Sequence, residues 1–284
     1  MSGSTVDLRV RYAELAGDHV YYANYFALLE VAMGKFYKDH GAPFLGHERK
    51  GVRTMVAESY ARFIEPARYD DEVRITSTLA AAAPKRLLFD HIVTCDGRPL
   101  LQAATTHVLL NAGERGLQPF SEEVLDLADK RVDRVNAVEA SDDETAEIPD
   151  GAFYNVAEMP IRYKETDAVG IVYFSNYYIY YEVGRTELFR SAGLTFNDLK
   201  AGGLRLPVVK AYCRYLAPAR YGDTIAVKTW VAGVKKVRLT FGYELSRRSD
   251  GSPIAVGFTT HACLNDTGRA ERVPEPIAGL AHTV

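Results

Sequence analysis

The sequence predicts an α+β protein in which one folding unit occurs twice along the chain. Three observations support this prediction: the two halves match over long runs, each half holds one long helix rich in aromatic residues, and β-branched segments follow that helix. A buried helix against a strongly curved antiparallel sheet accounts for all three, because the apolar faces of the two elements then bury each other.

The repeat is visible by direct comparison of the two halves. Asn24 matches Asn176, and the same spacing then holds without a gap to Phe89 and Phe241. A second run, DGRPLLQAATTHVLLN, matches DGSPIAVGFTTHACLN at a spacing two residues longer. This change falls before an Asp-Gly pair, where a hairpin turn absorbs it. We therefore expect a first repeat over 1–119, a helix and acidic linker over 120–152, and a second repeat over 153–284.

The elements of the second repeat follow from its residue pattern. VAEMPIRYKE alternates as a strand does, and a helix over 175–192 ends at Gly193, a residue suited to the left-handed C-cap position. Four later segments are β-branched and aromatic and predict strands; they begin at Leu206, Asp223, Lys236 and Pro253. In the linker, SEEVLDLADKRV predicts a helix, and the acidic run after it predicts a solvated segment.

Composition argues against several classes of function. The net charge is -3 and no basic block occurs, so the footprint of a nucleic-acid-binding protein is missing. No run approaches the ~18 apolar residues of a membrane span, and MSGSTVDLRV lacks the regions of a signal peptide. The three cysteines are scattered without a C-x-x-C, which disfavours disulfides and zinc. We expect a cytoplasmic protein without metal, cofactor, nucleic-acid or membrane partners.

Two related segments carry a resemblance to a known family. ETDAVGIVYFSNY runs from Glu165 to Tyr177, and a shorter relative, ELAGDHVYYANY, runs from Glu14 to Tyr25. With the later PARYGD segment, the order strand, T-D-x-x-G, helix and sheet resembles the hotdog-fold thioesterases of the 4-hydroxybenzoyl-CoA thioesterase family. The resemblance implies a tandem double hotdog, fused as a pseudo-dimer in which the sheets join and the sites lie between the halves. A dimer of pseudo-dimers stays open.

The resemblance also implies catalytic positions. Asp167 falls on the family's catalytic carboxylate, Gly170 on the glycine of the same loop, and Phe174 on the position whose backbone N–H receives the thioester oxygen. Many relatives carry His or Tyr at the Phe174 position. The first repeat departs further: it reads LAGDH where the second reads TDAVGI, and it has no acid matching Asp167. We therefore expect one active site per chain, with Asp18 unable to replace Asp167.

Further residues are candidates for substrate binding, and each also has a plain structural reading. Tyr177, Tyr180 and Tyr181 are expected to pack in the core, with one of the three in the wall of the acyl pocket, and Tyr173 is a further candidate for substrate binding. Lys235, Lys236 and Arg238 either meet CoA phosphates or form a solvated strand end. His261 is repeated as His107 in the half without the acid, which favours a structural role.

Two more expectations concern carboxylates and their neighbours. Glu58 and Ser59, the polar members of TMVAESYARF, are expected to line the Asp167 site from the first repeat. Glu182 lies mid-helix among aromatic residues, so we expect it to be buried and paired with Arg185. Asp167 itself has a structural alternative, the capping of a turn before the helix.

The chemistry of thioester hydrolysis explains why these residue types matter. The thiolate leaves readily, so the reaction needs a carboxylate, as nucleophile or as general base, and donors for the developing oxyanion. We expect hydrolysis of an acyl-CoA or acyl carrier protein thioester. Two alternatives stay open: a hotdog dehydratase or hydratase, which favours a His paired with an acid, and a non-catalytic acyl-CoA-binding protein.

Overall fold

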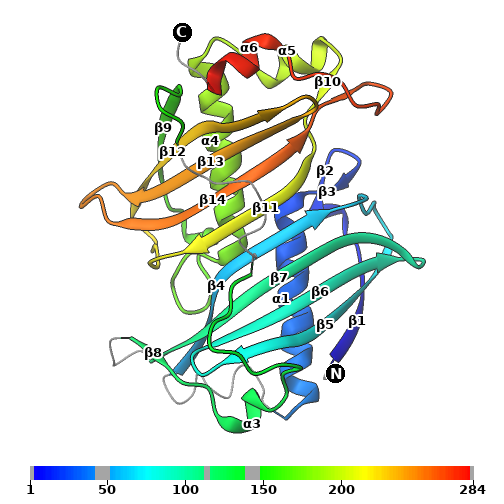
Figure 1. Ribbon diagram of the computed structural model, residues 1–284, viewed down its shortest axis with the longest axis vertical. Coiled ribbons are helices and arrows are strands. Elements are labelled where there is room, and N and C mark those ends of the chain that lie inside the picture. The colour runs from blue at the N-terminus through cyan, green and yellow to red at the C-terminus, as the bar shows by residue number, and fades with distance from the viewer. Residues whose placement is uncertain (1–2, 42–51, 112–115, 138–147, 282–284) are drawn as a thin grey trace. The chain divides into compact units, whose positions relative to one another are not determined.

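The computed structural model describes residues 3–41, 52–111, 116–137 and 148–281. The chain divides into two compact units, unit 1 over Met1–Glu139 and unit 2 over Ala140–Val284. In each unit one long helix lies against one face of an antiparallel sheet (Figure 1). The predicted α+β architecture with two hotdog units in tandem is confirmed.

Unit 1 orders its strands β1-β5-β6-β7-β4. The bounds of these strands are Gly3–Arg9 for β1, Glu72–Ala83 for β5, Arg86–Cys95 for β6, Arg98–Asn111 for β7 and Val52–Phe63 for β4, with β8 (Leu117–Gln118) beside β7. The long helix is α1 (Tyr22–Asp39). Before it come a 3-10 turn, η1 (Tyr12–Glu14), and two short paired strands, β2 (Leu15–Ala16) and β3 (His19–Val20).

Unit 2 repeats this order as β9-β12-β13-β14-β11. The bounds are Tyr154–Pro160 for β9, Thr224–Lys235 for β12, Arg238–Arg247 for β13, Pro253–Ala262 for β14 and Val208–Tyr215 for β11. Its long helix begins with a 3-10 turn, η3 (Phe174–Asn176), and continues as α4 (Tyr177–Ser191). Smaller elements complete the unit: η2 (Tyr163–Glu165), α5 (Phe196–Ala201), β10 (Leu204–Arg205), β15 (Leu264–Asn265), α6 (Glu275–Ala278) and η4 (Gly279–Ala281).

The predicted end of the long helix in unit 2 is confirmed in detail. Gly193 has φ +75 and donates its N–H to the carbonyl of Arg190, and Leu194 donates to the carbonyl of Phe189 at 2.8 Å. These two bonds form a Schellman motif, in which a glycine in the left-handed region satisfies carbonyls that the helix leaves open. The change in repeat spacing also lies in a hairpin, because the β6–β7 turn is shorter than the β13–β14 turn.

The segment after β8 packs on unit 1. α3 (Glu122–Leu125) is shorter than the helix predicted there, since the chain then turns and Ala82 donates its N–H to the carbonyl of Lys130 at 2.9 Å. Phe120, Val124 and Leu125 share a buried cluster with Phe36 and Phe89. α6 follows the same plan in unit 2, because Val273 donates to Lys236 there as Phe120 donates to Pro84 in unit 1. The repeated unit therefore includes this cap.

Candidate active site

A buried carboxylate anchors the loop that carries Asp167. Glu165 is 4% exposed and accepts hydrogen bonds from the backbone N–H of Arg162 at 2.8 Å and from the Arg162 guanidinium. The hydroxyl of Tyr180 donates at 3.1 Å to Oε2, the oxygen that also accepts the backbone N–H of Arg162. The hydrogen bonds and charge of Glu165 raise the pKa of Arg162 above its usual value. A buried carboxylate with this set of donors fixes the point where the loop begins.

The carbonyl of the same residue fixes the point where the loop ends. It accepts the backbone N–H of Tyr173 at 2.9 Å and the side-chain amide of Asn176 at 2.8 Å. Because Asn176 belongs to the first turn of the long helix, this carbonyl ties the loop to the helix start. Arg162, Glu165 and Asn176 are thus positioning residues for the segment between them.

Asp167 lies half-buried inside a tight loop. Its backbone N–H donates to the carbonyl of Ile171 at 2.8 Å, and Gly170 takes φ +77, a conformation that favours glycine. One carboxylate oxygen, Oδ1, accepts the backbone N–H groups of Val169 at 2.9 Å and Ile171 at 3.3 Å. Among the described residues, none donates to Oδ2. The capping role foreseen for Asp167 therefore occupies one oxygen, and the second stays available for chemistry.

Tyr177 lies close enough to Asp167 for the two groups to interact electrostatically. Burial raises the pKa of Tyr177 well above its usual value, and the charges of Cys213 and Asp167 raise it further. A backbone hydrogen bond from Ala219 acts in the opposite direction. Tyr177 is 3% exposed, and its ring packs edge-on against Tyr215 with centroids 5.0 Å apart. Its hydroxyl is therefore a neutral, fixed neighbour of the Asp167 loop.

Phe174 is the first residue of the 3-10 turn that opens the long helix, with Tyr173 at the N-cap. The first N–H groups of a helix have no partner within the helix, and they form the positive end of its dipole. Tyr215 donates its hydroxyl to the carbonyl of Phe174 at 3.0 Å, which holds this turn against β11. The loop and the helix start thus bring a carboxylate and a helix N-terminus to the same end of unit 2.

Unit 1 repeats the anchors and lacks the acid. Glu14 is 7% exposed and accepts the backbone N–H and guanidinium of Arg11, and its carbonyl accepts Tyr21 N–H and the Asn24 amide, each at 2.9 Å. Between these anchors, β2 and β3 form a small hairpin. Asp18 is exposed there and binds His19 and Arg68, which lower the pKa of its carboxyl group to about 2.

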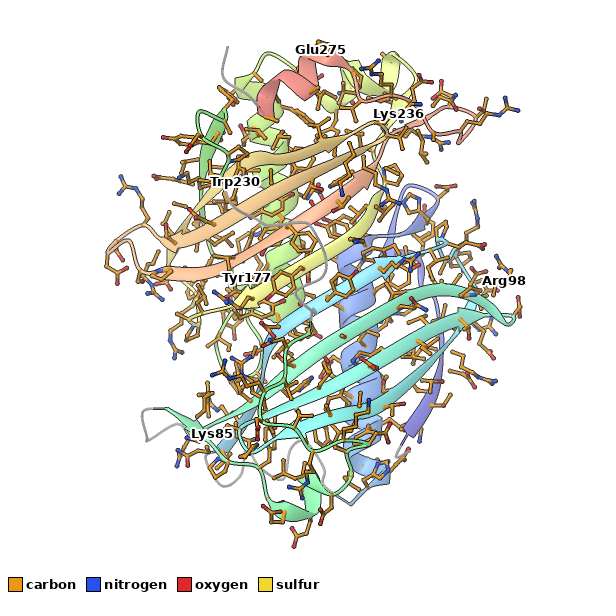
Figure 2. The ribbon with its side chains drawn as sticks, viewed as in Figure 1. Lys85, Arg98, Tyr177, Trp230, Lys236 and Glu275 are labelled. Atoms are coloured by element: carbon orange, nitrogen blue, oxygen red, sulfur yellow. The ribbon has the colours of Figure 1, made fainter. Side chains whose placement is uncertain are left out.

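The other predicted residues lie elsewhere in their units. His261 is 2% exposed, with Nε2 3.0 Å from the Thr259 hydroxyl and Nδ1 2.8 Å from the Leu206 carbonyl; burial lowers its pKa to about 3. Lys235, Lys236 and Arg238 are at the far end of β12 and β13 from the loop. A twelve-residue strand spans roughly 35 Å, and Figure 2 shows Tyr177 and Lys236 at opposite ends of unit 2.

Glu58 and Ser59 belong to β4 of unit 1. Glu58 is 4% exposed and accepts the backbone N–H of Ala137 at 3.1 Å and the hydroxyl of Thr106 at 3.4 Å. It therefore holds the segment after α3 against the sheet, and its predicted role toward Asp167 stays a prediction. The expectation for Glu182 is wrong, because this side chain is exposed. Arg185 is the buried member, and it donates to Tyr243 at 2.9 Å.

Two positioning residues, Arg162 and Glu165, were absent from the predictions. Tyr180 was predicted as a core or pocket-wall residue, and its hydrogen bond to Glu165 was not foreseen. The signal for Arg162 and Glu165 was present, because R-Y-x-E occurs before the loop in both repeats, at Arg11–Glu14 and Arg162–Glu165. Among the described residues, no group of three His, Cys, Asp or Glu side chains is placed to hold a metal ion. None of the described helices is both long and apolar enough to span a membrane.

The fold is that of two α+β hotdog units in tandem, and comparison with known sequences identifies the family. The chain belongs to the thioesterase-like superfamily, whose family model matches residues 9–128 and again residues 161–279. The chain is thus a tandem member of that superfamily, with each unit matching on its own.

Individual relatives agree with this assignment. A Bacillus subtilis protein, YneP, provisionally named an acyl-CoA thioesterase, is 38% identical over 35% of this chain and 77% of its own. The Arabidopsis thaliana acyl-acyl carrier protein thioesterase ATL2 is 30% identical over 45% of this chain and 67% of its own. A solved structure from Lactobacillus plantarum, provisionally named an oleoyl thioesterase, has a TM-score of 0.74 over 96% of this chain and 98% of its own, at 15% identity. This last likeness concerns the fold alone.

Proposed function

We propose that the chain hydrolyses acyl thioesters at one reactive centre, located at the Asp167 loop of unit 2. The observation that carries the proposal is the spare Oδ2 of Asp167, held by an ordered loop next to the start of a buried helix. Membership in the thioesterase-like superfamily and the names of the relatives support the reaction type. The substrate is then the thioester of a carboxylic acid with CoA or with a carrier protein.

The chemistry follows from what each group can donate or accept. The N–H of Phe174 receives the carbonyl oxygen of the thioester, which gains negative charge as the carbonyl carbon is attacked. Asp167 acts in one of two ways: Oδ2 attacks the carbon and forms a mixed anhydride that water then cleaves, or it takes a proton from a water that attacks directly. In both routes the C–S bond breaks and the thiolate leaves as the stable anion.

Gly170 contributes through its backbone. Its positive φ turns the chain so that Val169 and Ile171 both donate to Oδ1. Two N–H donors to one oxygen fix the orientation of the carboxylate and leave Oδ2 directed away from the loop backbone donors. Tyr173 and Tyr177 form the aromatic surroundings of the loop and the helix start, and we assign them to the wall of the substrate site.

The dehydratase or hydratase alternative fits this geometry less well. That chemistry favours a His paired with an acid, and His261 is engaged by Thr259 and Leu206 with its pKa lowered to about 3. Asp18 and His19 do form a pair at 2.9 Å, but both side chains are about half exposed or more. A reaction that needs a shielded acid–base pair has no support at that position.

A thiol-release assay over a panel of acyl-CoA and acyl carrier protein thioesters tests the proposal. We expect hydrolysis of at least one member, and titration with a slow substrate should count about one reactive centre per chain. Hydration or dehydration of an enoyl or hydroxyacyl thioester without thiol release would support the alternative enzyme. Tight binding with no reaction of any kind would support the non-catalytic reading.

A further inference from the structure

Each unit carries an exposed pair of tyrosines beside its loop. In unit 2, Tyr163 and Tyr221 are 78% and 64% exposed, with ring centroids 5.7 Å apart in an edge-to-face arrangement. In unit 1, Tyr12 and Tyr69 form the same pair at 5.9 Å. The pair is therefore part of the repeated fold, and any difference in function must come from the residues around it.

Charges around the two pairs differ in a consistent way. In unit 1, Arg9 binds Asp70 at 3.1 Å and Glu72 at 3.2 Å, and Arg68 binds Asp18 at 2.9 Å. In unit 2, Pro160 stands at the position of Arg9, Gly222 at that of Asp70 and Thr224 at that of Glu72. Unit 2 therefore lacks this arginine and both of its acidic partners.

Two cations beside the tyrosine pair of unit 2, Lys164 and Arg220, form no ion pair with a described residue. Lys164 replaces Ala13 of unit 1, and Arg220 is the counterpart of Arg68. Both side chains are exposed, and within the described ranges neither forms an ion pair or side-chain hydrogen bond. Arg68 is occupied by Asp18, whereas Arg220 is available to a ligand. The half with the acid thus presents two uncompensated cations next to two aromatic rings.

Backbone pairing places these cations close to Asp167. Asp167 pairs with Ile171, and Ile171 forms a β-bridge with Arg220. Two strand spacings put the Arg220 backbone about 10 Å from that of Asp167. Lys235 lies at the far end of β12, roughly 35 Å away. A pantetheine arm that starts at the reactive centre can reach Arg220, whereas Lys235 lies beyond its length.

We propose that Tyr163, Tyr221, Lys164 and Arg220 form the binding surface for the phosphorylated adenosine of a CoA thioester. This inference rests on the proposed function and selects CoA over a carrier protein. Phosphates would accept from Lys164 and Arg220, since Lys and Arg side chains are strong donors to phosphate. The purine would lie on the exposed ring of Tyr163 or Tyr221, because any base can stack on an aromatic face.

Two substrates with the same acyl group test the proposal. One is the CoA thioester, and the other is the N-acetylcysteamine thioester, which has no nucleotide and no phosphate. The variant is Lys164→Glu with Arg220→Glu, and the matched control in unit 1 is Ala13→Glu with Arg68→Glu. We expect kcat/KM for the CoA thioester, divided by kcat/KM for the N-acetylcysteamine thioester, to fall about tenfold in the variant. The fall should come from a higher KM for the CoA thioester. The unit 1 control should keep the wild-type ratio.

Further measurements separate the parts of the proposal. Adenosine 3′,5′-bisphosphate should inhibit hydrolysis of the CoA thioester competitively, and more weakly in the double variant and in Tyr221→Ser. Added salt should raise KM for the CoA thioester in the wild-type protein and much less in the variant.

Defined outcomes would overturn the inference. An unchanged ratio in the variant would exclude this surface from nucleotide binding. A selective loss with an acyl carrier protein thioester, and none with the CoA thioester, would assign the surface to a protein partner. If neither substrate releases thiol even in the wild-type protein, the proposed function fails, which is a different result from an unchanged ratio.

Discussion

The two loops that precede the long helices share their ends and differ in their middles. In both, an Arg–Glu pair holds the entry, and the carbonyl of that Glu binds a Tyr N–H and an Asn amide at the exit. Between these points unit 1 has a small hairpin with an exposed Asp18, and unit 2 has a loop one residue longer with a half-buried Asp167. The shared ends serve the fold, and the middle is where the two units diverge in chemistry.

The same contrast extends to the first helical turn. Val20 and Val172 donate to Ala67 and Ala219 at 2.9 and 2.8 Å, so the exits are also held alike against the Pro-Ala-Arg-Tyr segments. α1 is α-helical from Tyr22, while the equivalent Phe174 starts a 3-10 turn. A 3-10 turn is tighter than an α-turn and presents its N–H groups differently. The unit with the acid therefore also has its own helix start.

The largest expected effect comes from removing Asp167, which has no matching acid in the loop of unit 1. Asp167→Asn should lower kcat/KM for thioester hydrolysis by at least about 100-fold, as expected for loss of a nucleophile or base. Asp18→Asn should leave the rate within about twofold, because Asp18 is exposed and paired with Arg68. Thiol-release kinetics and melting profiles of both variants check this. The comparison breaks if Asp18→Asn abolishes activity or if Asp167→Asn retains most of it.

A smaller effect is expected from the anchors. Glu165→Gln and Glu14→Gln each remove a buried negative charge that binds an Arg, so each should lower the free energy of unfolding by about 1–3 kcal/mol. Only Glu165→Gln should also reduce kcat, by about tenfold, since only that anchor positions Asp167. Denaturant unfolding and steady-state kinetics measure the two consequences separately. Equal changes of kcat in the two variants would contradict a positioning role that belongs to Glu165 and not to Glu14.

Acid sensitivity should differ between the units. Burial lowers the pKa of His91, His107 and His261 to about 3 in the folded chain. Below the ordinary value of 6.5, unfolded histidines bind protons that the folded ones do not, so stability falls as pH drops toward 3. Each contributes at most about 1.4 kcal/mol per pH unit. Unit 1 has two of these residues, and unit 2 has Tyr243 at the position of His91.

Hydrogen exchange measures this difference within the intact chain. After correction for intrinsic exchange rates, amide protection in β6 should fall more than in β13 when the pH is lowered from about 6.5 to about 5. His91→Gln should narrow the gap, since it removes one buried base from unit 1. A larger loss in β13 would contradict the assignment of these histidines as neutral core residues.

The sequence was sufficient for the fold because the repeat and the residue patterns point the same way. The aromatic helix, the Gly193 cap and the four strands of unit 2 all appear near their predicted positions. The helix predicted at 121–132 is mostly absent because backbone pairing with β5 takes its second half. Glu182 was misplaced because a helix rich in tyrosine still leaves an exposed stripe, which composition alone does not locate.

The candidate site was less accessible to sequence reasoning. The T-D-x-x-G segment pointed to Asp167, yet the spare oxygen depends on which N–H groups the loop directs at Oδ1. Lys235, Lys236 and Arg238 were predicted as substrate-binding residues without regard to the length of the strand that precedes them, which can be counted in the sequence. The strand that starts after Asp223 carries the chain away from the loop for twelve residues before it reaches Lys235.

The smallest expected effect tests a contact that has no counterpart in unit 1. Tyr180 donates to Glu165 at 3.1 Å, whereas the equivalent residue in unit 1 is Leu28. Burial and the charge of Glu165 raise the pKa of Tyr180 well above its usual value, so its hydroxyl stays a donor throughout the working pH range. Tyr180→Phe removes this bond and leaves those from Arg162 in place.

The Glu14 anchor forms without such a tyrosine, so the loop of unit 2 should persist in Tyr180→Phe as well. We expect a loss of about 1 kcal/mol in the free energy of unfolding, the usual size for one buried hydrogen bond, and a change in kcat of threefold at most, about 0.7 kcal/mol. Urea unfolding and the pH profile of thiol release measure both. A loss of tenfold or more in kcat with unchanged stability would instead make the Tyr180 hydroxyl a participant in the reaction, since a group that only supports Glu165 cannot change the rate without weakening the anchor.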